Sequence, residues 1–433
     1  MRQLLYITPY FPPQTQVGAL RPLKFVRHLP ALGWQPIVLC DLWASDAADT
    51  ELEGLVPQDV IVARNYSRRA HAAYAELHSG VKKAKAVPRG KPLHERIIPQ
   101  SLQNPEWMPL GEHSPDMPWA YRAARRLLKL YPNIEAIVVN ADPFAASVVG
   151  ARLHQTTGLP VIQDFRDIWA PCKLRRPRRP KPWLWLEDKL ERYCFENAAH
   201  VVVNTQISLN DYRRFYPEMP PEKFSVIRNF FDAELVDHGQ HVGFDRYTLL
   251  HLGHFSRFRV ADPLVRALAQ ALALGVPRDQ IQVVSTGAFG SQARELAKQL
   301  GIDDLLHQQV SVPYQAIGAL MHSADLLVMI AEPDADQRIA SKFYDYLGAG
   351  RPLLAISDNP ESKDILDTCG AGAQFAHADI AAMAHFIAAE FAAGRQRNVE
   401  RNLAGLDAVE ASRNLVKILD AVTGKPTRGA GEI

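Results

Sequence analysis

The residues best suited to chemistry lie in one charged stretch in the last third of the chain. From Gln337 it reads Gln-Arg-Ile-Ala-Ser-Lys-Phe-Tyr-Asp-Tyr-Leu-Gly-Ala-Gly-Arg-Pro. Ser341 is predicted to be the N-cap of a helix, whose first backbone N–H groups and positive dipole end attract phosphate. Arg338 and Lys342 flank that helix start. Together these side chains predict a site that neutralises a diphosphate.

Asp345 lies one turn beyond Ser341 on the same face of the predicted helix. A carboxylate at this place can accept the protons of two ribose hydroxyls, as the acidic residue does in nucleotide-binding α/β folds. The alternative is a simple ion pair, because Asp345 and Lys342 are three residues apart on one helix. Both interpretations are open at this point.

Short apolar runs that alternate with helical stripes surround these residues, and the pattern occurs twice. In the first half, an apolar strand at 4–8, a helix from 20 and a strand at 36–39 open a parallel sheet. In the second half the pattern restarts at 248–252 and continues to 352–356. We therefore expect an α/β protein of two Rossmann-like, doubly wound domains that face each other across a ligand-binding cleft.

The composition shifts along the chain predict where these domains begin and end. The first domain is expected at 1–230, with a basic insertion at about 44–117, and a polar linker at 231–243. The second domain is expected at 244–400. A C-terminal helix and tail at 401–433 could cross back to the first domain.

Charge and cysteine content exclude several classes of protein. The chain has 433 residues with 49 Lys and Arg against 47 Asp and Glu, a net charge of +2, so a strongly basic nucleic-acid binder is excluded. Its 4 cysteines are widely spaced and no histidine cluster has zinc-ligand spacing, so neither a disulfide framework nor a metal site is predicted. No signal peptide and no long apolar span are recognisable. We expect a cytoplasmic protein, either free or attached to the inner face of a membrane.

The charged stretch resembles the donor-binding signature of retaining glycosyltransferases of the two-Rossmann-domain (GT-B) type, family 4 in particular. That signature reads close to P-S-K-hydrophobic-x-E-Y-hydrophobic-A-x-G-R-P. The residues that match it are Lys342, Tyr346, Gly350, Arg351 and Pro352, and Asp345 stands where the family has Glu.

Further similarities occur in order along the chain. Tyr-Phe-Pro-Pro at 10–13, followed by Gly18 and Arg21, is similar to the first loop of the family. The stretch at 164–169 is similar to its D-F-R-D-P-W element, 228–232 to its N-G-F-D hinge, and 324–328 to its A-D-L-L strand. On the acceptor side the candidates are Asp142, Asp164, Arg166 and Asp167. The alternatives are that Gly18 and Arg21 only form a turn and that the Arg and Asp residues form an internal network.

The resemblance implies a retaining, metal-independent glycosyltransferase with a nucleotide-diphosphate sugar as co-substrate and no cofactor. The diphosphate would be bound by Arg338, Ser341 and Lys342 with Arg257 or Arg259, and Gly18 and Arg21 would also lie on the donor side. Gln337 would hold a sugar hydroxyl, and Gln337 and Lys342 are the expected catalytic residues. Gln337 is a departure, because the family has a glutamate there.

The expected acceptor is a saccharide or a lipid-linked molecule, in the synthesis of a surface polysaccharide or glycoconjugate. Six cations between Lys173 and Lys181, followed by Trp183 and Trp185, suit an anionic membrane surface. A solvated loop, or a loop that binds an anionic acceptor, is the alternative.

Two other functions fit the pattern. A nucleotide-sugar epimerase shares the two-domain architecture and needs no acceptor. A catalytically silent nucleotide-sugar-binding subunit is favoured by Gln337. An oxidoreductase is disfavoured because no G-x-G-x-x-G fingerprint is present.

Overall fold

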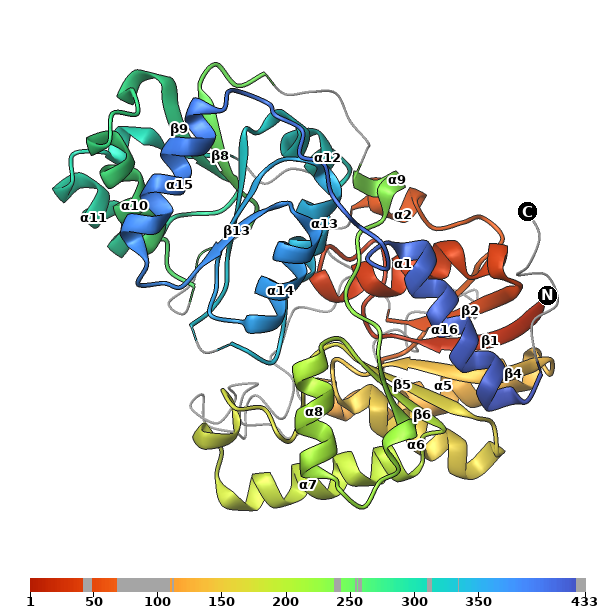
Figure 1. Cartoon of the computed structure of the whole chain (residues 1–433). Coiled ribbons are helices and arrows are strands. Elements are labelled where there is room, and N and C mark those ends of the chain that lie inside the picture. Colours follow the sequence, from red (N-terminus) through yellow and green to blue (C-terminus); the bar gives the residue numbers. More distant parts are fainter. Residues whose placement is uncertain are drawn as a thin grey trace, which may run out of the picture. The chain divides into compact units, whose positions relative to one another are not determined.

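The computed structural model describes residues 1–41, 49–67, 110, 113–236, 243–253, 255, 259–309, 314–333 and 335–425 (Figure 1). The chain divides into two compact units. Unit 1 consists of residues 1–204, 208–227 and 412–433, and unit 2 of residues 205–207 and 228–411. Among the described residues, no helix has both the length and the apolar composition that crossing a membrane requires.

Unit 1 is built on a seven-stranded parallel sheet. In spatial order its strands are β3 (Ile61–Arg64), β2 (Trp34–Cys40), β1 (Arg2–Ile7), β4 (Ile134–Asn140), β5 (Val161–Phe165), β6 (His200–Val203) and β7 (Phe224–Val226). Leu5 of β1 lies opposite Ile37 of β2 and Ile137 of β4. These central strands are apolar on both faces, as is usual where helices cover both sides of a parallel sheet.

Helices cover both faces of this sheet. Four pack on one face: α5 (Met117–Leu130), α6 (Ala145–Thr157), α7 (Lys181–Glu196) and α8 (Gln206–Phe215). Figure 1 shows α1 (Leu20–His28) and the C-terminal helix α16 (Ala408–Thr423) on the other face. The first sheet is therefore completed by residues from both ends of the described chain.

Structure also occurs inside the insertion expected at 44–117. Helix α2 (Thr50–Gly54) and strand β3 lie within it, and β3 pairs with β2 in the sheet. Part of the stretch expected to be an insertion is therefore regular structure, and β3 belongs to the sheet. The most basic part of that stretch, residues 68–109, lies outside the described residues.

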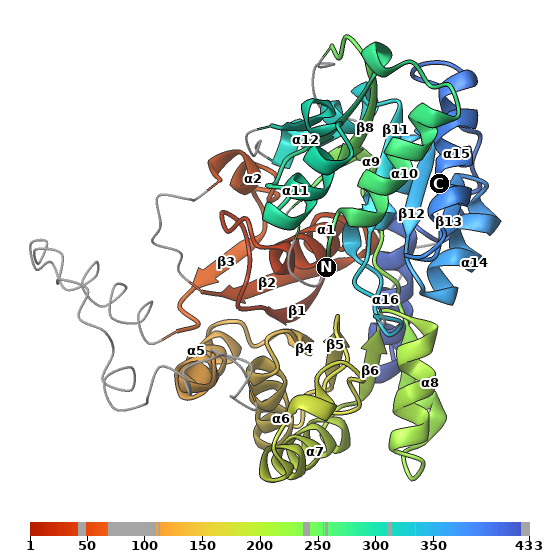
Figure 2. The same cartoon turned by 90° about the vertical axis from the view of Figure 1, so that its left-hand side faces the viewer.

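Unit 2 contains a six-stranded parallel sheet, seen from a second side in Figure 2. Its order is β10 (Leu306–Gln308), β9 (Ile281–Ser285), β8 (Tyr247–His251), β11 (Leu326–Ile330), β12 (Leu353–Ile356) and β13 (Gly372–Phe375). One face packs against α10 (Asp262–Ala273), α11 (Ser291–Gln299) and α15 (Ile380–Ala392). The other packs against α9 (Ala233–Val236), α12 (Tyr314–Ser323), α13 (Ser341–Ala349) and α14 (Pro360–Cys369).

The expected linker at 231–243 is partly structured. Phe231 forms a parallel bridge with Asp407, and its ring fills the space beside Gly348 of α13, where a Cβ atom would lie 2.7 Å from the ring. Helix α9 follows within unit 2, and residues 237–242 lie outside the described residues. The division between the units accordingly falls after Ile227, shortly before the predicted boundary at 230.

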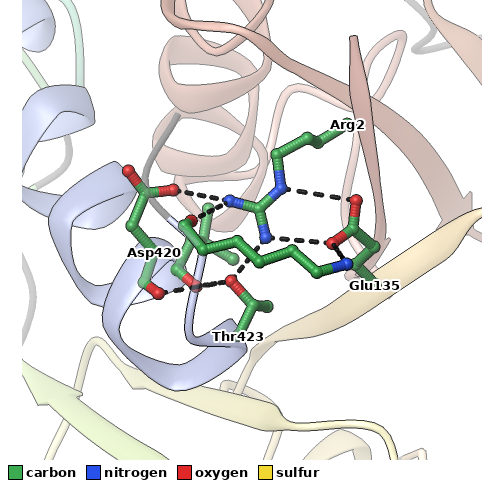
Figure 3. A network of polar contacts seen from close by, with 6 residues as sticks. Arg2, Glu135, Asp420 and Thr423 are labelled. Carbon is green, nitrogen blue, oxygen red and sulfur yellow. Dashed lines mark hydrogen bonds and ion pairs between the residues drawn. The ribbon is translucent and has the colours of Figure 1, made fainter. Parts of the chain in front are cut away.

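Arg2 joins the start of β1 to the end of α16 (Figure 3). Its guanidinium pairs with Glu135 of β4 at 3.1 Å and with Asp420 of α16 at 2.8 Å, and it also bonds the hydroxyl of Thr423. The same guanidinium lies 4.0 Å above the ring of Trp34. One side chain thus connects three strands of the sheet with the last helix.

Candidate functional site

The start of helix α13 is the centre of the candidate site. Ala340 occupies the N-cap position with extended backbone angles, φ −62° and ψ 141°, and no side chain caps the helix. The predicted N-cap, Ser341, is wrong by one residue, because Ser341 is already the first helical residue. Without a side-chain cap, the positive end of the helix dipole is available to an anion.

Lys342 reaches from this helix start to the loop after strand β8. Its Nζ donates a hydrogen bond to the carbonyl of Leu252 at 2.6 Å. One turn further along α13, the hydroxyl of Tyr346 accepts a bond from the backbone N–H of Leu252 at 2.8 Å. Two matching residues of the signature therefore hold both backbone groups of Leu252. The hydrogen bond observed for Lys342 goes to this carbonyl rather than to Asp345.

Gly253 leaves room for the Lys342 amine. Its φ is +123°, in the region that favours glycine, and a Cβ atom there would lie 2.7 Å from Lys342 Nζ. The glycine is thus required both by the backbone and by the close approach of the cation.

The site is cationic. Burial, with Arg259 nearby, lowers the pKa of Lys342 to about 7. Burial also lowers the pKa of Arg259, against the opposing effect of Glu332, and Arg338 forms an ion pair with Glu332. Arg259 therefore lies within electrostatic range of both Lys342 and Arg338. Such an arrangement suits an anion with more than one negative charge.

The remaining donor candidates are placed as follows. Gln337 is buried, and its backbone carbonyl accepts a bond from the Thr205 hydroxyl at 3.0 Å. Asp345 is also buried, on the second turn of α13. Arg257 lies outside the described residues.

His251 is a residue of this region that the sequence analysis did not single out. It ends strand β8, and its Nδ1 lies 2.9 Å from the carbonyl of Val328. Its ring stacks on Phe255 with centroids 4.4 Å apart. Burial and the charge of Lys342 lower the pKa of His251 well below the ordinary value. Its position directly before Leu-Gly at the end of a strand is the only sequence signal that could have identified it.

In unit 1, Arg21 and Asp164 form one buried ion pair. Arg21 donates to both carboxylate oxygens at 2.9 and 2.8 Å, and to the carbonyl of Ile227 at 2.9 Å. The side chains are 4% and 2% exposed. For Asp164 the structure therefore favours an internal network over acceptor contact, and its partner in that network is Arg21.

Asp142 and Arg166 form a second ion pair at the carboxyl ends of β4 and β5. Both remain partly exposed, and burial raises the pKa of Asp142. Asp167 lies within electrostatic range of both. Gly18 packs against this pair, because a Cβ atom there would lie 3.1 Å from Arg166 and 2.7 Å from the ring of Tyr10. The structure brings Asp142, Arg166 and Asp167 together, so these three residues remain the acceptor-side candidates.

Comparison with known proteins gives one family match. The model of Glycosyltransferase Family 4 matches residues 63–235. No curated protein sequence matches the chain.

Solved structures resemble the whole chain. Sucrose-phosphate synthase from Thermosynechococcus elongatus is 15% identical with a TM-score of 0.59, over 98% of this chain and 95% of that one. Anabaena HepE, solved in complex with UDP-glucose, is 16% identical with a TM-score of 0.54, over 98% and 99%. A putative UDP-N-acetylglucosamine 2-epimerase from Listeria monocytogenes is 10% identical with a TM-score of 0.56, over 100% and 99%.

These findings test two predictions. The resemblance to family 4 glycosyltransferases is confirmed by the family match. The GT-B fold of two Rossmann-like domains is confirmed by the two parallel sheets and by the structural neighbours.

Proposed function

We propose, on the basis of the family 4 match and the cationic site at the start of α13, that the protein is a retaining glycosyltransferase. It transfers a sugar from a nucleotide-diphosphate sugar to a saccharide or lipid-linked acceptor, in the synthesis of a surface polysaccharide or glycoconjugate. The observation that carries the proposal is the placement of Lys342 beside Gly253, with Arg259 and Arg338 nearby.

The proposed mechanism follows from charge. As the bond between sugar and phosphate breaks, the leaving diphosphate gains negative charge, and cations and backbone N–H groups already in place lower the barrier. In the proposal, Lys342, Arg259, Arg338 and the start of α13 supply them without a metal ion. Asp345 binds the ribose, and Gln337 donates to or accepts from a hydroxyl of the sugar.

The structural neighbours include both a sugar-nucleotide complex, Anabaena HepE with UDP-glucose, and an epimerase. The family match favours the transferase. Product analysis with the sugar nucleotide alone separates the alternatives. An epimerase converts the sugar nucleotide to its epimer, whereas a transferase forms no epimer. A silent binding subunit binds the sugar nucleotide and shows no turnover even when acceptors are added.

The donor site is tested by thermal shift with uridine, guanosine and adenosine diphosphate. At a concentration about 100 times Kd, a ligand stabilises the folded state by about 2.7 kcal/mol. Asp345→Asn keeps the shape of the side chain and removes its charge, so we expect about tenfold weaker binding, equivalent to about 1.4 kcal/mol. The exposed Asp364→Asn on α14 is the matched control. Equal stabilisation of the wild type and Asp345→Asn would remove Asp345 from the donor site.

A lipid-linked acceptor implies that the protein contacts a membrane. The structure favours a different set of residues for this contact than the six cations at 173–181. Several cations of the basic loop are engaged within the unit: Arg176 pairs with Asp188 at 2.7 Å, and Arg179 with Glu187 at 3.1 Å. At the start of α7, Trp183 is 37% and Trp185 63% exposed. Lys181 and Lys189 are exposed one turn to either side of Trp185. We propose that this tryptophan and lysine surface meets anionic lipid.

The membrane proposal is tested by co-sedimentation with vesicles of phosphatidylglycerol and phosphatidylcholine. The double variant Trp183→Ser with Trp185→Ser should lose at least about tenfold in partitioning, because indole rings favour the membrane interface. Leu130→Ser, which removes a 64% exposed leucine elsewhere in unit 1, is the control. Undiminished binding of the tryptophan variant, or equal loss in both, would contradict the proposal.

A further inference from the structure

The segment Asp336–Ile339, which leads into α13, is held by hydrogen bonds to each of its carbonyl groups. The side-chain amide of Asn359 donates to the carbonyl of Asp336 at 2.8 Å and to that of Arg338 at 3.2 Å. These two carbonyls flank Gln337. The side-chain amide of Asn359 therefore bonds to the backbone on both sides of Gln337, the residue that the proposed mechanism places at the sugar.

The other two carbonyls of the segment, those of Gln337 and Ile339, accept bonds from other residues of unit 2. The hydroxyl of Thr205 donates to the carbonyl of Gln337 at 3.0 Å, and the amide of Asn229 donates to that of Ile339 at 3.2 Å. Thr205, Asn229 and Asn359 are all buried. Because a buried carbonyl without a partner is destabilising, these bonds fix the path of the segment.

Asn359 uses the other end of its carboxamide for a second purpose. It is the N-cap of α14, and its Oδ1 accepts a bond from the backbone N–H of Ser362 at 3.0 Å. Aspartate and serine cap helices about as well as asparagine. Neither of these side chains can also donate two N–H groups, so helix capping alone does not explain why this position holds an asparagine.

We propose that Asn359 is a positioning residue for sugar transfer: it holds the segment of Gln337 and Arg338 in the geometry that the reaction needs. This inference rests on the proposed function. It places the residue outside the reacting groups, since Asn359 acts only through backbone carbonyls. Misplacement of a reacting group by about 1 Å can lower the rate about a hundredfold.

The variants Asn359→Asp and Asn359→Ser test the inference because both retain a capping oxygen and lose both N–H donors. We expect kcat to fall about 30- to 100-fold. The Kd for uridine diphosphate should rise by no more than about tenfold, less than kcat falls, because the released segment carries Arg338 while Lys342 and Arg259 stay in place. Amide hydrogen exchange of residues 336–340 should rise at least about tenfold.

The matched control is Asp49→Ala, which removes the N-cap of α2 in unit 1, where the Asp49 carboxylate accepts from Leu52 N–H at 2.9 Å. It should lower the melting temperature and leave kcat and exchange at 336–340 unchanged. The inference is overturned if both Asn359 variants keep kcat within about threefold of the wild type, or if exchange at 336–340 does not change. If the wild type turns over no sugar nucleotide, the proposed function fails, while the exchange comparison still decides whether Asn359 holds the segment.

Discussion

Replacing Lys342 with methionine is expected to abolish stabilisation by uridine diphosphate and to lower sugar transfer about a hundred- to a thousandfold. Methionine fills the space of the lysine stem but carries no charge to meet the leaving diphosphate. The exposed Lys298→Met on α11 is the control. Retained ligand stabilisation in Lys342→Met would show that the diphosphate lies elsewhere.

The same substitution should not destabilise the ligand-free protein. A lysine has a pKa of about 10.4 when unfolded, whereas burial and Arg259 lower the pKa of Lys342 to about 7 in the folded state. Between these two values the unfolded state binds more protons, so the free energy of unfolding rises with pH over this range. Below pH 7 the buried charge opposes folding. Lys342→Met removes that opposition but also the hydrogen bond to the carbonyl of Leu252, and a net gain of about 1 kcal/mol would raise the melting temperature by about 2–4 °C.

Ligand binding should then take up a proton. Above pH 7 the amine of the free protein is largely neutral, and the diphosphate restores its charge. The affinity for uridine diphosphate is expected to fall up to about tenfold per pH unit above pH 7.5. Calorimetry at pH 8.5 in buffers of different ionisation enthalpy measures this uptake, which should approach one proton per bound diphosphate; no uptake would contradict the prediction.

Asp164→Ala is expected to lower the free energy of unfolding of unit 1 by about 3–5 kcal/mol, because it leaves the Arg21 guanidinium buried without its carboxylate. The pair is only 4% and 2% exposed. The double variant Arg21→Met with Asp164→Ala should recover most of this loss, since no uncompensated charge remains.

Tryptophan fluorescence during urea unfolding measures this effect in unit 1 alone. All 7 tryptophans lie between Trp34 and Trp185, so none lies in unit 2. The exposed Asp59→Ala is the control, with an expected change within about 0.5 kcal/mol. A similar small change in Asp164→Ala would mean that the ion pair contributes little, and would return Asp164 to the acceptor-side candidates.

Local patterns made much of the fold predictable. Apolar runs such as 4–8 and 326–330 identify buried parallel strands, and the signature of α13 identifies the helix that centres the site. The short, half-buried edge strand β3 was missed although the apolar run at 60–63 marks it, because it lies within the stretch that was assigned to an insertion. Strand β13 is likewise half-buried, and α14 and α15 around it were also not predicted.

Long-range pairing explains what the sequence could not predict about the site. The sequence analysis assigned Arg21 to the donor side and Asp164 to the acceptor side. In the structure these two side chains pair with each other across a sequence separation of 143 residues, which no local pattern reveals. The sequence suggests that the cations near Arg176 can bind lipid, but Arg176 and Arg179 form ion pairs with carboxylates of the following helix, α7. The roles of Asn359 and His251 depend on carbonyls of other loops and strands, which carry no side-chain signal.

The bonds between Arg2 and helix α16 have a consequence for synthesis of the chain. A ribosome adds about 5–20 residues per second from the N-terminus, so strands β1 to β7 emerge before any of α16 exists. Leu415 and Leu419, which are buried in the finished protein, arrive only after all of unit 2. The unit that is made first is therefore finished last, and a nascent chain paused within unit 2 exposes to chaperones the apolar surface that Leu415 and Leu419 later cover.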